Sequence, residues 1–310
     1  MDQIFGNISL LIEFPIVNLA IILEGLMIGA LFALAAYGLA LVWGVMNVKN
    51  LAQGDFVIGG GYVSWWLAKN VAIHPLLGVP IAFVIMWGIG WITYKLVISR
   101  VIERDLFTSL LATFGLAIMM AQIMNLLFGS DTQSLELDVS FLGLPNTFTF
   151  ADGIINLPAA KVIGVFLAAA LATAVILFMK NSRMGQAIRA TAQDARAARV
   201  LGIDTEKVYA FTFSLNAAIC GAAGAIIVMV WVIQPFYGIT YSVRAFVIVT
   251  AAGLGNLPGV IAAGLGIGAA EQYGSHIFGI QYQQAIAVIL LLLVLVYRLM
   301  QQRRHRQVLQ

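Results

Sequence analysis

The chain has 310 residues, of which 61% are hydrophobic and only 10% are charged, and its mean hydropathy is +0.96. Because soluble domains carry about 25% charged residues, this composition excludes a fully water-exposed globular protein and predicts one embedded in lipid. The formal net charge of +3 does not indicate nucleic-acid binding, since the basic residues are confined to loops and the tail, as orientation signals are.

The first half of the chain contains four predicted membrane segments. Residues 25–48 carry no charge and exceed the ~20 residues that a spanning helix needs. Their Gly25-x-x-x-Gly29 motif permits close approach of another helix, although this spacing also arises by chance in a chain with 30 glycines. Residues 56–68 are charge-free but short and rich in glycine, so we expect a broken or re-entrant helix whose start is buried in protein. The other two spans are residues 76–94 and 107–128.

Charged residues in the loops predict how the segments are oriented. Residues 129–157 contain acidic residues and neither Lys nor Arg, so we expect an extracytoplasmic loop. The alternating pattern within it indicates a small strand-like lobe. Residues 99–105, 181–208 and the tail 298–310 are basic and are therefore expected in the cytoplasm. Acidic residues before the first span favour an extracytoplasmic N-terminus, but acidic residues carry little weight in the positive-inside rule, which counts Lys and Arg.

The second half of the chain contains a segment that the sequence itself interrupts. Residues 245–270 carry no charge, but glycines loosen the backbone and a proline removes a helical donor in their middle. We expect a split or re-entrant helix, broken at Gly253, Gly255, Pro258 and Gly259. Uninterrupted spans are predicted at residues 162–179, 209–233 and 284–296.

These elements predict an all-α polytopic membrane protein with about eight membrane segments, one or two of them incomplete. The whole chain, residues 1–310, is expected to form a single transmembrane domain.

The longest strongly charged stretch, residues 183–207, lies between two of these spans. Its alanines favour helix, and Gly202 followed by Asp204 provides a stop and then a new N-cap. We therefore expect a short amphipathic helix over residues 192–201, held at the membrane surface, of a kind that can insert into a groove on a partner. The alternative is an ordinary cytoplasmic loop made basic by the positive-inside rule.

Within this stretch, Arg196-Ala197-Ala198 followed after three residues by Gly202 resembles the EAA–x3–G pattern of the coupling loop in ABC importer permeases. Arg stands where the pattern has Glu. Three further stretches are similar to permeases of the branched-chain amino acid importer family, and together they span most of the chain. They are residues 185–224, residues 50–62 (beginning Asn50-Leu-Ala-Gln-Gly54-Asp55) and residues 244–259.

The resemblance implies a transport subunit that carries out no bond chemistry itself. It implies a second, homologous permease subunit, two cytoplasmic ATPase subunits that bind ATP and Mg, and an extracytoplasmic substrate-binding protein, all at a bacterial or archaeal cytoplasmic membrane. The resemblance also implies coupling to the ATPases through Arg196, Ala197, Ala198 and Gly202. Branched-chain amino acids are the expected substrate; urea, short amides or other small organic solutes are the alternative within transport. A channel-like membrane subunit without ATP coupling is the alternative outside it.

No motif in the sequence points to chemistry by this chain. It contains no Walker A motif, so ATP-derived energy must come from a partner. The three histidines and the single cysteine, Cys220, are scattered without ligand spacing, so no metal site is expected. The Gly253-Leu-Gly255 run lies in a span without a preceding strand, which favours a helix break over a dinucleotide site.

Five polar side chains fall at or near membrane depth: Glu24, Gln53, Asp55, Asn256 and Glu271. Polar groups there are costly and usually face a cavity or a partner. Broken helices can offer N–H groups to a substrate carboxylate and oxygens to an ammonium group. We expect Gln53, Asp55 and Asn256, at the two broken segments, to line the translocation pathway. The alternative is that they cap helices and bond to backbone at the bends.

Overall fold

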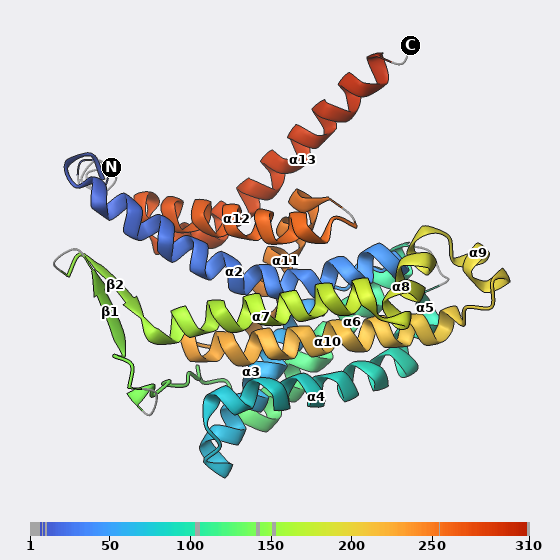
Figure 1. Cartoon of the computed structure of the whole chain (residues 1–310), viewed down its shortest axis with the longest axis horizontal. Coiled ribbons are helices and arrows are strands. Elements are labelled where there is room, and N and C mark those ends of the chain that lie inside the picture. The colour runs from blue at the N-terminus through green and yellow to red at the C-terminus, as the bar shows by residue number, and fades with distance from the viewer. Residues whose placement is uncertain are drawn as a thin grey trace.

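The computed structural model describes residues 7, 9, 11–102, 106–140, 143–150, 153–253 and 255–308. Predictions for residues 103–105 and for Leu254 in the break therefore lie outside the described residues. Long helices run side by side as a bundle, with a β-hairpin at one end and two short helices at the other (Figure 1). We call these the hairpin end and the α9 end.

Each predicted membrane segment contains a helix, which confirms the all-α fold. In the described part of the chain, five helices are long and apolar enough to cross a membrane, and a bent pair adds a sixth span. The long helices are α2 (Pro15–Met46), α3 (Gln53–Val71), α4 (Pro75–Thr93), α6 (Leu106–Phe128), α7 (Ala159–Asn181), α10 (Thr205–Val230), α11 (Gly238–Ala252), α12 (Leu257–Phe278) and α13 (Gln283–Val308). The short elements are η1 (Tyr94–Ile98), α5 (Ser99–Val101), β1 (Thr147–Phe150), β2 (Ile155–Pro158), α8 (Arg183–Gln193), α9 (Ala195–Val200), η3 (Pro235–Tyr237) and η4 (Ile280–Tyr282).

Helix α10 forms the centre of the bundle. The most apolar 18-residue stretch of α10 is 94% buried. The corresponding stretches are 28% buried in the continuous helix of α4, η1 and α5, 22% in α6 and 28% in α7. A Cβ on Gly224 would lie 1.7 Å from the carbonyl oxygen of Val57, so α10 and α3 are in backbone contact. Because apolar side chains need not be hidden from lipid, the exposed helices form the lipid-facing rim of the bundle.

The α2–α12 contact depends on glycine in both helices. A Cβ on Gly29 would lie 2.4 Å from the carbonyl oxygen of Gly264, and one on Gly268 would lie 2.4 Å from Cα of Gly29. The Gly25-x-x-x-Gly29 motif therefore serves close approach, as its spacing predicts. Helix α12 presents the same spacing, from Gly264 to Gly268, to its partner.

Helix α3 begins inside the protein, as predicted for the segment at residues 56–68. Helix α2 ends at Asn47, which has a left-handed backbone (φ 53°), and the chain then turns back before α3 starts. Gln53, Gly54 and Asp55 in the first turn are all buried. The helix itself is continuous, so the interruption lies in the segment that precedes it.

The second interruption is a sharp turn between α11 and α12, whose axes differ by 120°. Gly253 (φ +93°) and Gly255 (φ +77°) adopt backbone conformations that L-residues with a side chain rarely take. Pro258 lies in the first turn of α12, where its missing N–H costs no helical hydrogen bond. This turn confirms the broken helix in the predicted fold.

The connections at the two ends differ from the predictions in detail. Strands β1 and β2 pair antiparallel, with Thr147 opposite Pro158, and supply the strand-like lobe. The short helix predicted over residues 192–201 is present as α9, but it begins only at Ala195, so its predicted start is wrong. Two helices, α8 and α9, meet at Asp194, whose extended backbone (φ −154°, ψ 106°) ends one and caps the next.

Candidate functional site

Asp194 sets the geometry of the short helix α9. Its Oδ1 accepts hydrogen bonds from the backbone N–H groups of Ala197 at 3.0 Å and Arg196 at 2.8 Å. These bonds hold the pKa of Asp194 below its ordinary value. Helix interruption at this residue follows from the same bonds, because a side-chain acceptor at the N-cap competes with continuation of the preceding helix.

The predicted coupling residues lie together on and just after α9. Ala198 is 2% exposed and anchors the helix to the bundle, while Arg196 and Ala197 are exposed. Gly202 has φ +85° and ends the segment, and Asp204 caps α10 through its hydrogen bond from the N–H of Lys207. The stop and new cap expected from the sequence are both present.

Two exposed apolar side chains, which the sequence reasoning did not single out, lie between Ala198 and Gly202. Val200 is 87% exposed and Leu201 is 80% exposed. A cavity of about 600 Å³ lies beside this segment. Arg199 and Ile203 line it, together with Tyr94 of η1 and Ser99 of α5. Apolar side chains in a run of charged ones were the signal available in the sequence.

Gln53 is fully buried and ties three helices together in the middle of the bundle. Its Nε2 lies 2.8 Å from the carbonyl oxygen of Ala35 on α2, and 3.0 Å from Oδ1 of Asn216 on α10. The same nitrogen is 2.8 Å from Sγ of Cys220. These contacts pair the buried Nε2 of Gln53, whereas Oε1 of Gln53 and Nδ2 of Asn216 have no hydrogen-bond partner in the described structure.

Asp55 occupies the point where two helices begin. It lies in the first turn of α3, and a Cβ on Gly238, the first residue of α11, would approach its Oδ1 to 2.2 Å. The backbone N–H of Gly54 donates to Oγ of Ser242 on α11 at 2.8 Å. Both helix N-termini therefore present partial positive charge near this carboxylate. In the described structure, Oδ2 of Asp55 has no hydrogen-bond partner.

Asn256 is exposed and lies at the other interruption, where it caps α12. Its Oδ1 accepts from the N–H of Gly259 at 3.0 Å, and its Nδ2 donates to the carbonyl oxygen of Ala252 at 3.3 Å. Within the described part of the chain, Asn256 makes no hydrogen bond to Gln53 or Asp55. The observed bonds of Asn256 are those expected of a residue that caps a helix, whereas Gln53 bonds to backbone and side chains of two other helices.

A buried ion pair, Arg244–Glu271, bridges α11 and α12. Nε of Arg244 lies 3.2 Å from Oε2 of Glu271, and their side chains are 9% and 3% exposed. The guanidinium carbon is 4.6 Å from the ring centre of Phe32 on α2. Glu271 was noted from the sequence, whereas Arg244 was not, because it lies one residue before the charge-free run.

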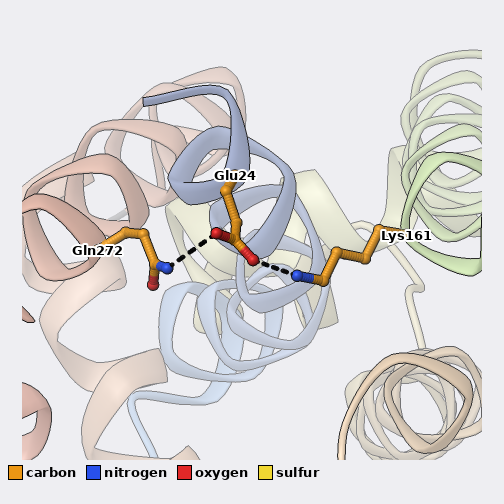
Figure 2. A network of polar contacts seen from close by, with 3 residues as sticks. All are labelled: Glu24, Lys161 and Gln272. Atoms are coloured by element: carbon orange, nitrogen blue, oxygen red, sulfur yellow. Dashed lines mark hydrogen bonds and ion pairs between the residues drawn. The ribbon is translucent and has the colours of Figure 1, made fainter. Parts of the chain in front are cut away.

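A third polar cluster lies toward the hairpin end, and Figure 2 shows its three members. Lys161 on α7 is ion-paired with Glu24 on α2, and Nε2 of Gln272 on α12 donates to the second oxygen of Glu24 at 3.2 Å. Lys161 and Gln272 were missed by the sequence reasoning. The available signal was a lysine beside the acidic loop, where the positive-inside rule disfavours it.

Comparison with known proteins decides the family. The family model described as "Branched-chain amino acid transport system / permease component" matches residues 21–296, which is most of the chain. The chain belongs to this family. It is a multi-pass membrane permease component, not an enzyme, and ATP hydrolysis in such systems resides on partner subunits.

Relatives of this permease occur in bacteria and archaea. It is 30% identical over 289 residues to the high-affinity branched-chain amino acid transport system permease protein BraD of Pseudomonas aeruginosa, covering 89% of this chain and 92% of that protein. It is 30% identical to LivH of Escherichia coli K12, covering 88% and 91%. The probable LivH of Methanocaldococcus jannaschii is 29% identical, with 88% and 89% covered.

Proposed function

We propose that this permease is the transmembrane subunit of an ATP-driven importer that moves branched-chain amino acids inward by alternating access. Membership of the permease family supports the substrate class. Loop charges support the orientation of the chain in the membrane: the acidic loop of residues 129–157 adjoins the hairpin end, which is then extracytoplasmic, and the basic α8–α9 segment is then cytoplasmic. Glu24 near the start of α2 contacts Lys161 near the start of α7, so the N-terminal end of α2 lies on the extracytoplasmic side as well.

The geometry of α9 is the observation that carries the coupling mechanism. Its N-terminus is fixed by Asp194, and its C-terminal side is fixed by the turn at Gly202 and the cap at Asp204. Between these fixed points, Val200 and Leu201 project with 87% and 80% exposure. Exposed apolar side chains on a rigid element mark a protein contact. We infer that an ATPase subunit docks here, so that its motion reaches the spans through α10.

The assembly implied by this mechanism has partners on both sides of the membrane. A second, homologous permease would complete the pathway, two cytoplasmic ATPases would bind ATP and Mg, and an extracytoplasmic binding protein would deliver substrate. This chain supplies the path and the coupling contact.

Co-purification from mild detergent tests the docking surface. In Val200→Ser/Leu201→Ser, we expect the ATPase subunits to be lost from the purified sample, because the apolar contact is removed while Ala198 still anchors α9. The control is Ile154→Ser, an exposed apolar residue (48%) in the hairpin turn, which should keep all partners. ATPases retained by the double serine variant at the level of the control would overturn the docking proposal.

Whether Gln53, Asp55 and Asn256 line the pathway stays a prediction. Among them, Asp55 has the geometry that favours it most, because its carboxylate lies beside the starts of α3 and α11, and its Oδ2 has no hydrogen-bond partner in the described structure. We expect Asp55→Asn to lower the uptake rate at least several-fold in proteoliposomes, with partner subunits still bound. Unchanged uptake and substrate range in both Asp55→Asn and Asn256→Ala would remove these residues from the pathway.

A further inference from the structure

A cavity of about 340 Å³ opens beside the Glu24–Lys161–Gln272 cluster. Small-molecule sites are typically cavities of ~300–1,000 Å³, with mostly apolar walls and a few convergent polar groups. This cavity has both kinds of wall. Glu24 and Lys161 supply opposite charges, and Ile28, Trp231 and Ile280 supply apolar surface. Ile28 follows Glu24 by one helical turn on α2, so the two side chains lie on the same face of that helix.

The two charges are accessible to a ligand from water. The side chain of Glu24 is 38% exposed and that of Lys161 is 18% exposed, whereas the Arg244–Glu271 pair is shielded. Partly exposed ion pairs contribute little net stability, so a ligand that brings its own opposite charges can replace the mutual contact at small cost. Gln272, shown in Figure 2, holds one oxygen of Glu24 and leaves the other toward Lys161.

We propose that this cavity binds the head group of an α-amino acid with an apolar side chain. The ligand ammonium group would pair with Glu24, its carboxylate with Lys161, and its side chain would pack on Ile28, Trp231 and Ile280. The inference rests on the proposed function and deepens it. Since the cavity lies toward the hairpin end, it is the place where this permease first holds an amino acid released from outside.

A purely structural role for the pair makes a different prediction. If Glu24 and Lys161 only hold α2 and α7 together, removing either charge disturbs every ligand and every transport step alike. A binding site instead pairs each residue with one group of the ligand. Ligands that lack one charged group therefore separate the two roles.

The test measures binding to the purified complex in lipid nanodiscs by isothermal titration calorimetry, with three probes. These are L-leucine, leucinamide, which lacks the carboxylate, and 4-methylpentanoate, which lacks the ammonium group. We expect Lys161→Met to weaken leucine binding at least tenfold and to leave leucinamide affinity unchanged. Glu24→Gln should likewise weaken leucine binding and leave 4-methylpentanoate affinity unchanged. Lys180→Met, an exposed lysine at the opposite end of α7, should change none of these affinities.

A second variant avoids any effect on assembly. Ile280 is 77% exposed, so Ile280→Ala should fold normally and weaken leucine binding more than glycine binding. The proposal is overturned if the charge variants weaken all three probes equally, or if Ile280→Ala leaves leucine affinity unchanged. Absence of leucine binding in a wild-type complex that still imports leucine would overturn the site alone. A complex that imports no leucine at all would contradict the proposed function itself.

Discussion

Arg244 and Glu271 place two opposite charges where water scarcely reaches them. Burying either charge alone is costly, and their contact at 3.2 Å offsets part of that cost. Arg244 gains further stabilisation from the face of Phe32, because a desolvated cation over an aromatic ring is attracted by its quadrupole. The pair joins the two helices on either side of the 120° turn, so it holds that turn in a defined shape.

Removing one charge of this pair should be worse than removing both. We expect Glu271→Gln or Arg244→Met to lower the stability of the detergent-purified protein by about 3–5 kcal/mol, since each leaves a buried uncompensated group. The double variant Arg244→Met/Glu271→Met should recover most of that loss. Thermal unfolding midpoints check this prediction, and losses that simply add in the double variant would contradict the coupling.

At the scale of elements, glycine determines how closely helices approach. Gly268 of α12 meets the backbone of α2 directly: its Cβ would lie 2.4 Å from Cα of Gly29 and 2.5 Å from the carbonyl oxygen of Gly25. Backbone atoms cannot rotate aside as a side chain can. Association of helices in lipid depends on such close packing, because lipid tails are as apolar as the helix surfaces and the hydrophobic effect does not drive the helices together.

Gly268 and Gly266, both on α12, therefore provide a test position and a matched control for this packing. We expect Gly268→Ala to destabilise the protein by about 1–3 kcal/mol through overpacking of the α2–α12 contact. Gly266→Ala should be neutral or slightly stabilising, because in the described structure a Cβ there has no neighbour within 4 Å. The measurement is the unfolding midpoint of each variant, and equal effects at the two positions would show that this packing account is wrong.

At the scale of the whole molecule, lipid as solvent made the helices predictable. Each of the eight charge-free runs contains a helix, and in the described part of the chain five helices and one bent pair are long and apolar enough to span. Gly253, Gly255 and Pro258 located the turn in the bent pair. The division at Asp194 was not predicted, because alanines on both sides favour one continuous helix and only the backbone conformation of Asp194 interrupts it. Composition thus predicts which segments span the membrane, but it does not predict where a surface helix such as α9 begins.

The contacts between side chains on distant segments could not be predicted from the sequence. Gln53 and Asp55 were identified as polar groups at a bend, but their partners Asn216 and Gly238 lie on other helices. Lys161 is unusual in the sequence only for its place beside the acidic loop, and its partner Glu24 is 137 positions away. Which polar residues meet is determined by helix packing, and the periodicity of a single segment contains no information about it.

If α9 transmits ATP-driven motion to the spans, a backbone change at Gly202, which ends the α9 segment, should uncouple ATP hydrolysis from transport. Its φ of +85° is accessible to Gly and tolerated by Asn, whereas a β-branched residue is strained there. The measurement is the ratio of leucine imported to ATP hydrolysed in proteoliposomes that contain the purified complex and a leucine-binding protein. We expect Gly202→Val to lower this ratio at least tenfold with ATPases still bound, while Gly202→Asn keeps it near the wild-type value. Equal ratios in the two variants and the wild type would show that α9 does not transmit this motion.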